Sequence, residues 1–227
     1  MAALIGIAIL IALGVWQLER RSWKLDLIDR VGQRVHAPPV AAPGPTDWPD
    51  IGAARDEYRH VSVSGHFTDA PATLVQAVTE LGGGYWVLTP FRTADGFTIL
   101  VNRGFVPPDR RDVPASDETA VTGLLRLTEP KGGFLRANDP GQDRWYSRDV
   151  AAIAAARGLN DVAPYFIDED AGADPASFPR GGLTVIDFPN NHLVYALTWF
   201  VLALMLAVMT IGARFNKRLP SHKTDLS

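Results

Sequence analysis

The sequence has 227 residues, of which 47% are hydrophobic, and its formal net charge is -3. Because this charge is small and the basic residues are scattered, the chain lacks the electrostatic signature of nucleic-acid binding, and we expect no nucleic-acid partner. Cysteine is absent, which excludes disulfides, thiolate nucleophiles and thiolate metal sites. Any metal chemistry must therefore use histidine, carboxylates or a prosthetic group.

The chain begins with an apolar segment, residues 1–18, that predicts a first transmembrane helix. As a helix it would be about 27 Å long, with Trp16 at the interface. It has neither a basic n-region nor a small-x-small cleavage site, which favours an uncleaved anchor over a signal peptide. Apolar residues continue at three- to four-residue spacing between charged ones through residues 19–36, which predicts an amphipathic helical extension.

Residues 37–52 are rich in Pro, Ala and Asp and predict an irregular linker, whereas residues 53–188 predict a β-rich domain. Alternating and β-branched runs indicate strands at Tyr58–Phe67, Tyr85–Arg92, Phe97–Asn102, Val121–Leu127, Pro164–Ile167 and Leu183–Ile186. The Asp-Gly pair of Thr93–Gly96 marks a hairpin turn. A helix is expected at Ser147–Arg157, with Ser147 as its N-cap and Gly158 as its stop. This pattern favours a small twisted barrel or sandwich.

Several polar groups of this domain do not match a known type of chemical site. Gly82–Gly84 lacks the Gly-Lys-Ser/Thr continuation of a phosphate loop and is expected to be a flexible turn. Asp168–Asp170 lacks the ligand spacing of a calcium loop and is expected to be a solvated loop. His60 and His66 lie too far apart along one strand to share a metal ion, so we interpret them as surface histidines.

A second apolar segment, residues 189–213, predicts the second transmembrane helix. Pro189 suits its first turn, and Asn190 or Asn191 can cap it. Its uncharged part spans roughly the 30 Å hydrocarbon thickness of a bilayer. The expected fold class is thus a membrane protein with two transmembrane helices flanking a mainly β (β-rich α+β) extramembrane domain.

His192 lies in the opening turn of this second helix, at the membrane boundary. Tyr195 and Trp199 follow it at i+3 and i+7, so the three side chains share one helical face. A ring nitrogen beside two aromatic planes suits a large flat ligand with a metal centre. From composition alone, an interfacial aromatic belt and a hydrogen-bonding boundary histidine explain the same residues equally well.

Four blocks of sequence share the motifs of one known family. They are residues 13–24, which match Gly-x-Trp-Gln-x-x-Arg-x-x-Trp-Lys; Glu57-Tyr58-Arg59 leading to Gly65 and Phe67; residues 84–91 continuing through 99–107; and Asn191-His192-Leu193-x-Tyr195-x-x-Thr198-Trp199. With these blocks the chain resembles the Surfeit locus family of cytochrome c oxidase assembly factors, called Shy in yeast. The resemblance covers both apolar segments and the domain between them.

The resemblance implies that the protein binds haem a and assists its insertion into cytochrome c oxidase subunit I, with haem a synthase and membrane lipid as further partners. The second-span histidine, here His192, is then the ligand of the haem iron. No catalytic residue is carried over, so the resemblance implies no enzyme. A bacterial member is expected because no transit peptide is recognisable, and the missing basic lead of the family predicts a natural start upstream of Met1.

The first block is expected to lie beside the His192 turn, because both occur at the outer ends of paired antiparallel spans. Arg20 would then pair with a haem propionate, since a guanidinium fork fits a carboxylate. The predicted cofactor-binding residues are His192, Tyr195, Trp199, Trp16, Gln17 and Arg20. The alternative is a structural chaperone without haem, which stabilises subunit I by packing its two helices while His192 only forms a hydrogen bond.

The basic C-terminal tail and the two spans together predict that both termini are cytoplasmic and that the domain is periplasmic, in a multi-pass protein of the cell inner membrane. The tail, residues 214–227, is basic up to Asp225, which favours a cytoplasmic C-terminus. Basic residues after the first span favour the opposite orientation, so the charges alone leave both open. We expect a phosphatase fusion inserted near Gly132 to be active and a C-terminal fusion to be inactive. The reverse pair of activities would overturn this topology.

Overall fold

The computed structural model describes residues 1–113, 115–133, 135–174, 176–186 and 188–216, with the side chains of residues 214–216 excepted. The chain divides into two compact units. One is Val31–Val185, and the other combines Met1–Arg30 with the segment from Ile186 onward. Most of the predicted basic tail, residues 217–227, lies outside the described residues.

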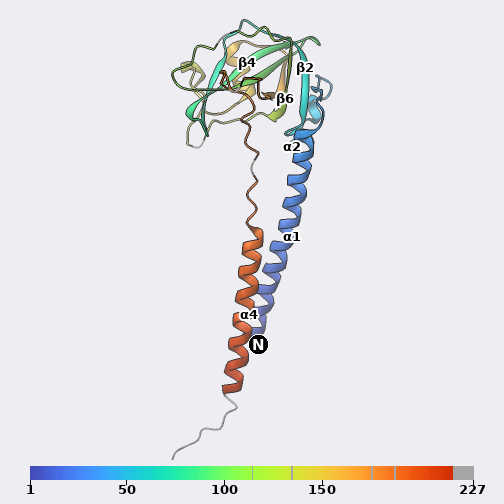
Figure 1. The fold of residues 1–227 in the computed structure, drawn as a ribbon, viewed down its shortest axis with the longest axis vertical. Helices are drawn as coiled ribbons and strands as arrows, with labels where there is room; N and C mark the ends of the chain where they lie inside the picture. Colours follow the sequence, from blue (N-terminus) through green and yellow to red (C-terminus); the bar gives the residue numbers. More distant parts are fainter. Residues whose placement is uncertain (114, 134, 175, 187, 217–227) are drawn as a thin grey trace, which may run out of the picture. The chain divides into compact units, whose positions relative to one another are not determined.

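The Val31–Val185 unit is built on a mixed sheet. Its strands are β1 (Val40–Ala41), β2 (His60–Phe67), β3 (Thr73–Thr79), β4 (Gly82–Thr93), β5 (Thr98–Val106), β6 (Ala120–Leu127) and β7 (Val162–Glu169). The order is β1-β2-β6-β7-β5-β4-β3, and an additional pairing of β2 with β4 closes the sheet into a barrel (Figure 1). Around the closed ring the neighbours are antiparallel except for β5 and β7, which are parallel. A barrel, rather than a sandwich, is therefore the architecture.

Alternation along the central strands separates two apolar cores. In β5, Ile99 packs in the barrel core, whereas Leu100 packs in a second cluster with the helix α3 (Val150–Arg157). In β7, Ile167 and Phe166 divide in the same way. Both faces of these strands are buried, which explains why their sequences are continuously apolar.

The predicted strands are largely confirmed, but β3 was not predicted. Its buried face carries Thr73, Val75 and Ala77, while apolar Leu74 and Val78 point to the other side. Because apolar residues occupy both faces, the period-two pattern is hidden.

Two further predictions about strands are wrong. Gly82–Gly84 is not a turn but the start of β4, paired with residues 77–79, and the turn falls at Glu80 and Leu81. Leu183–Ile186 contains no strand. Instead, Thr184 donates a hydrogen bond to Asp168 in the barrel, so side-chain contacts, rather than a strand ladder, hold this segment.

The helix α3 begins later than predicted. Its N-cap is Asp149, whose side chain accepts a hydrogen bond from the Ala152 amide at 3.1 Å. Ser147 is buried and instead accepts hydrogen bonds from the Gly132 amide and the Asn138 side chain. The predicted stop is confirmed, since Gly158 closes the helix with φ of +63°.

The predicted linker, residues 37–52, is part of the barrel rather than a free connection. β1 pairs in parallel with β2. Next, Trp48 in the 3-10 helix η1 (Trp48–Asp50) meets the Phe97 ring edge-on, with centroids 5.7 Å apart. Tyr165 donates a hydrogen bond of 2.7 Å to the Pro43 carbonyl. The short helix α2 (Ala53–Asp56) then leads into β2.

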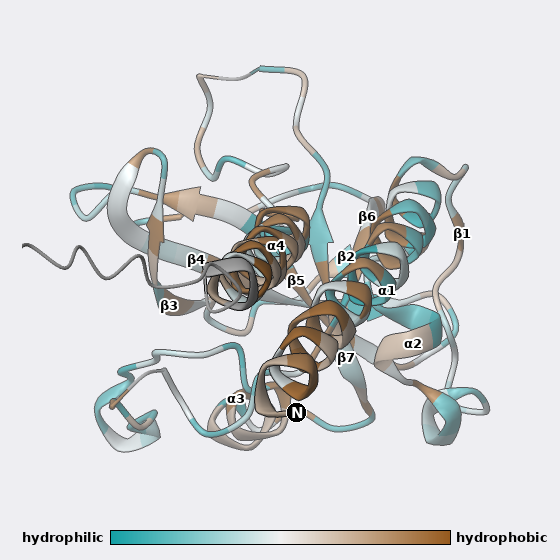
Figure 2. Cartoon of the chain, turned by 90° about the horizontal axis from the view of Figure 1, so that it is seen from below, coloured by the Kyte–Doolittle hydropathy of each residue, from teal (hydrophilic) through white to brown (hydrophobic). Residues whose placement is uncertain are grey.

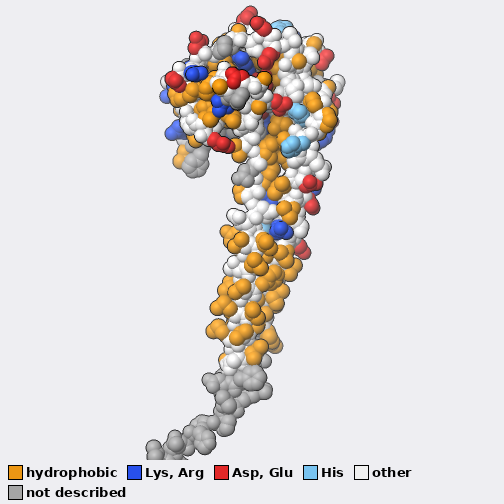
Figure 3. Space-filling view, in the orientation of Figure 1, with side chains coloured by type: hydrophobic (Ala, Val, Ile, Leu, Met, Phe, Trp, Pro, Cys, Tyr) orange, Lys and Arg blue, Asp and Glu red, His pale blue; other side chains and the backbone are white. Residues whose placement is uncertain are grey.

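The other unit contains the helix α4 (His192–Asn216) and most of α1 (Ala2–His36). The two helices pack closely at small residues: a Cβ on Gly14 would lie 2.5 Å from the Phe200 ring, and one on Gly6 would lie 3.2 Å from Leu206. Both helices are long and apolar enough to cross a membrane, and only 6% and 11% of their apolar windows are buried. Figure 2 shows the hydrophobic colouring of both helices, and Figure 3 shows hydrophobic side chains on their surface. Such exposure distinguishes them from core helices of a globular domain.

Gly104 in β5 provides a test of the barrel geometry. Its φ is +120°, and a Cβ there would lie 2.1 Å from the backbone of Arg180. Arg180 and Phe105 also exchange two backbone hydrogen bonds of 2.9 Å. We expect Gly104→Ala to lower the free energy of unfolding by at least about 2 kcal/mol, through strain and displacement of this backbone.

The control for this prediction is Gly83→Ala, because an added Cβ at Gly83 meets nothing within 4 Å. Urea unfolding of the full chain in detergent, followed by tryptophan fluorescence, measures both variants. Equal stability of Gly104→Ala and the control would contradict the prediction.

Candidate functional site

The close packing of α1 and α4 brings Gln17 to His192. His192 is the first residue of α4, and the Asn191 carbonyl accepts hydrogen bonds from the Val194 and Tyr195 amides. Nδ1 of His192 lies 2.8 Å from Oε1 of Gln17. The predicted juxtaposition of Gln17 and His192 is confirmed. Pro189, however, precedes the helix and does not lie in its first turn.

The second ring nitrogen of His192 is available for another interaction. Among the described residues, Nε2 has no hydrogen-bond or ion-pair partner, and the side chain is half-buried. A neutral imidazole that donates through one nitrogen keeps a lone pair on the other. This group can therefore accept a proton or ligate a metal.

The other predicted binding residues surround this pair less directly. Trp16 and Tyr195 are 53% and 55% exposed, and Trp199 is half-buried. Neither these three side chains nor Arg20 forms a hydrogen bond or ion pair with His192 among the described residues. Tyr195 and Trp199 share the helical face of His192, as the spacing predicts.

Two cations lie on the α1 face that carries Gln17, at positions i+3 and i+7 from it. The Arg20 guanidinium stacks on Trp23 at 4.1 Å from the ring centroid, and Lys24 Nζ lies 5.1 Å from the Phe188 centroid. Neither has a carboxylate partner among the described residues. Lys24 was missed as a site residue, although it ends the first sequence block.

In the barrel, a buried carboxylate collects several polar groups. Asp168 is 4% exposed. One of its oxygens accepts hydrogen bonds from Asn102 at 2.7 Å and Arg148 at 3.1 Å, and the other accepts from Arg126 at 2.8 Å and Thr184 at 2.9 Å. The prediction of a solvated loop at Asp168–Asp170 is wrong, because β7 continues through Glu169 and Asp168 is buried.

Two glutamates complete what we call the Asp168 cluster, which consists of Glu57, Asn102, Arg126, Glu129, Arg148 and Asp168. Glu57 accepts a hydrogen bond of 2.8 Å from Arg126, and Glu129 accepts from Arg148. Burial alone would lower the pKa of Arg126, but Asp168 and Glu57 outweigh it and raise this pKa above its usual value. The Arg126 guanidinium therefore stays charged. Hydrogen bonds to Asp168 from Asn102 and Arg126 join β5, β6 and β7.

Glu169, the residue after Asp168, has a raised pKa. Burial, and then the neighbouring carboxyl of Glu118, raise the pKa of Glu169 to about 8, against the opposing charge of Arg103. Glu169 is therefore mostly protonated at neutral pH. A carboxyl of this kind is compatible with its half-buried position at the end of β7.

The two strand histidines differ in their surroundings. His66 is exposed, as predicted. His60 is not a free surface histidine: its ring nitrogens lie 2.8 Å from the Ala37 carbonyl and 2.9 Å from the Asp170 carboxylate. Burial alone would lower its pKa, but these two partners outweigh burial and raise the pKa above its usual value.

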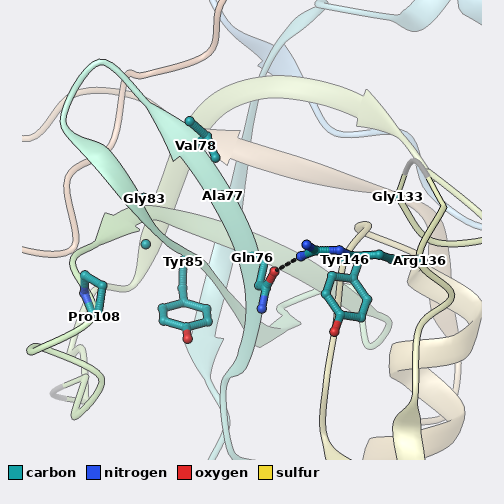
Figure 4. Close-up of a pocket in the computed structure, with 10 residues that line it drawn as sticks. Gln76, Ala77, Val78, Gly83, Tyr85, Pro108, Gly133, Arg136 and Tyr146 are labelled. Carbon is teal, nitrogen blue, oxygen red and sulfur yellow. Dashed lines mark hydrogen bonds between the residues drawn. The ribbon is translucent and has the colours of Figure 1, made fainter.

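A cavity of about 490 Å³ lies beside β3 and β4. Arg136 donates a hydrogen bond of 3.2 Å to Gln76 there, with Tyr85 and Tyr146 on the wall (Figure 4). Its lining contains none of the predicted site residues. Among the described residues, no group of three or more His, Asp or Glu side chains could hold a metal ion. His192 and its surroundings thus remain the best candidate site.

Comparison with known families identifies the chain. The SURF1 family model matches residues 4–204, which include the barrel, Gln17 and His192. The chain belongs to the SURF1 family. Surfeit locus protein 1 of Rattus norvegicus is 37% identical to it over 211 residues, covering 83% of this chain and 66% of the rat protein.

Two other relatives agree with this assignment. Surfeit locus protein 1 of Homo sapiens is 38% identical over 215 residues, covering 84% of this chain and 69% of the human protein. That of Takifugu rubripes is 33% identical over 230 residues, covering 91% of this chain and 92% of the fish protein. This SURF1-family chain spans slightly less than two thirds of the rat and mouse relatives.

The Asp168 cluster yields a stability prediction. Asp168→Ala leaves Arg126 and Arg148 buried without the carboxylate that they share, so we expect a loss of about 3–5 kcal/mol in the free energy of unfolding. Asp112→Ala is the control, because Asp112 is exposed, and its expected change is within about 0.5 kcal/mol. Urea unfolding of the full chain in detergent measures both. Similar stabilities of the two variants would show that the cluster does not hold the barrel.

Proposed function

We propose that this protein is a cytochrome c oxidase assembly factor, which binds haem a at the outer boundary of the cell inner membrane and assists its insertion into oxidase subunit I. His192 is the proposed ligand of the haem iron. The proposal is based on the contacts of the His192 ring. Nδ1 contacts Gln17, while Nε2 has no partner among the described residues. Imidazole is a common ligand of haem iron.

The position of His192 suits this ligand. It begins α4, directly before an apolar run long enough to span a bilayer. A porphyrin with an apolar tail is stabilised where its ring meets protein and its tail meets lipid. Tyr195 and Trp199 add aromatic surface on the same helical face. The donor set of one imidazole and neighbouring aromatic rings therefore fits a haem.

Charge near the site supports the same ligand. Arg20 and Lys24 lie on the Gln17 face of α1, stacked on aromatic rings and without a carboxylate partner among the described residues. A haem carries two propionates, and a guanidinium or ammonium group pairs well with a carboxylate. Arg20 is the proposed propionate partner, and Lys24 is a second one.

Bound haem would supply an iron atom that takes a nitrogen ligand. The residues of this chain would hold and orient it: His192 through Nε2, and the two cations through the propionates. Among the described residues, no second titratable side chain forms a hydrogen bond with His192. Such an arrangement is suited to binding and delivery rather than to catalysis, with subunit I as the recipient and haem a synthase as a possible source.

A structural chaperone is the second candidate, and one observation favours it. His192 already has a hydrogen-bond partner in Gln17, and Gly14 packs against Phe200 in the same helix pair. These contacts alone give His192 a role in joining α1 to α4. In that case the helix pair would stabilise subunit I without carrying haem.

The substitution His192→Ala separates the two functions. We expect the haem a that copurifies with the full chain, measured by its Soret absorption, to fall by more than about tenfold. Membrane insertion should be unchanged, because the apolar run of α4 is intact. His192→Met should retain part of the haem, since a thioether also ligates iron.

The control is His66→Ala, which removes an exposed histidine from the barrel and should leave the haem content unchanged. Undiminished haem in His192→Ala, together with normal oxidase assembly, would contradict the ligand assignment and favour the structural chaperone.

A further inference from the structure

We infer that Gln17 is a positioning residue, which holds His192 in the tautomer with a proton on Nδ1 and thereby makes Nε2 the ligating atom. The inference rests on the proposed function, since it concerns how the same histidine is prepared for haem. In this role Gln17 acts on His192 and does not itself contact the haem.

The direction of the hydrogen bond follows from its two atoms. Oε1 of Gln17 is a carbonyl oxygen, which can only accept, and it lies 2.8 Å from Nδ1 of His192. With the Gln17 amide in this orientation, the ring donates through Nδ1. A neutral imidazole has a single N–H, so Nε2 is left with a lone pair and no proton.

Helix packing keeps the glutamine at this distance. Gly14, one turn before Gln17, is buried, and the Phe200 ring occupies the space where a Cβ would lie. On α4, Ala196 lies one turn after His192 and is 1% exposed. Small residues on both helices thus allow a close backbone approach around the hydrogen bond. Since this approach fixes the two helices, the Gln17 amide and the imidazole are held together before any ligand binds.

The setting at a membrane boundary strengthens the effect. Hydrogen bonds are electrostatically stronger where water is scarce, and a donor bond from the second ring nitrogen makes an imidazole a more basic ligand. A more basic ligand stabilises the ferric state and lowers the reduction potential of haem iron. Because Gln17 is uncharged, it orients the ring without placing a negative charge in the apolar region.

The tautomer can be measured without haem. In the full chain labelled with ¹⁵N-histidine, in detergent, ring nitrogen shifts should show His192 with protonated Nδ1 and bare Nε2, the signal being assigned by its absence in His192→Ala. Gln17→Leu, which removes the acceptor, should shift the ring toward the tautomer with protonated Nε2. Finding that tautomer already in the natural chain would overturn the inference.

The second measurement uses haem a itself. Gln17→Leu should bind it about 10- to 100-fold more weakly, with a higher midpoint potential of the bound iron. Gln17→Glu keeps an acceptor and strengthens it, so this variant should retain haem and show a lower potential. Gln142→Leu, in an exposed glutamine of the barrel, is the control and should leave both values unchanged.

The outcomes distinguish this inference from the proposed function. Full haem retention in His192→Ala would reject the haem ligand itself. If His192→Ala loses haem while Gln17→Leu changes neither the tautomer nor the affinity and potential, only the role of Gln17 is rejected. A Gln17→Glu variant that binds haem with an unchanged potential would also count against that role.

Discussion

The barrel depends on one strand that changes its partner along its length. β2 pairs with β6 through residues 60–64 and with β4 through residues 65–67. Gly65 lies at the change, where a Cβ would approach the Arg92 carbonyl to 2.1 Å. A side chain would therefore separate β2 from β4 and open the ring. Closure buries the inner apolar core and removes two sheet edges.

The order of the strands determines where the charged residues meet. Glu57 precedes β2, Arg126 lies in β6 and Asp168 ends β7, and these strands are neighbours in the ring. Their side chains meet because β2, β6 and β7 are paired side by side. Removal of Asp168 takes away the carboxylate that Arg126 and Arg148 share. The cluster thus ties the integrity of the barrel to the pairing of distant strands.

The helical unit follows a different principle, in which small residues set the distance between helices. Gly14 admits the Phe200 ring, and the resulting contact of α1 with α4 places Gln17 at His192. Polar side chains at the end of an apolar helix cost free energy unless they form hydrogen bonds. The contact with Gln17 supplies a hydrogen bond to one ring nitrogen of His192. The remaining nitrogen is the chemical feature on which the proposed haem function is based.

Sequence alone determined those features that depend on local pattern. Two long apolar runs predict two helices, and the strands β2, β5 and β6 follow from alternation and the Asp-Gly turn. Family-like blocks predicted the SURF1 assignment, which the family match confirms. The pairing of two antiparallel spans predicted the meeting of Gln17 with His192, which the 2.8 Å contact confirms. Each of these signals is carried by neighbouring residues or by a continuous motif.

The surroundings of Asp168, the strand β3 and the orientation of the His192 ring were decided by the tertiary structure alone, because they depend on contacts between residues far apart in the sequence. The sequence predicts a solvated loop at Asp168, whereas in the structure Arg126 of β6, Arg148 and Thr184 surround its carboxylate. Similarly, β3 has apolar residues on both faces, so only its pairing with β4 makes it a strand. Which ring nitrogen of His192 faces Gln17 also has no local signal, since the two residues lie 175 positions apart.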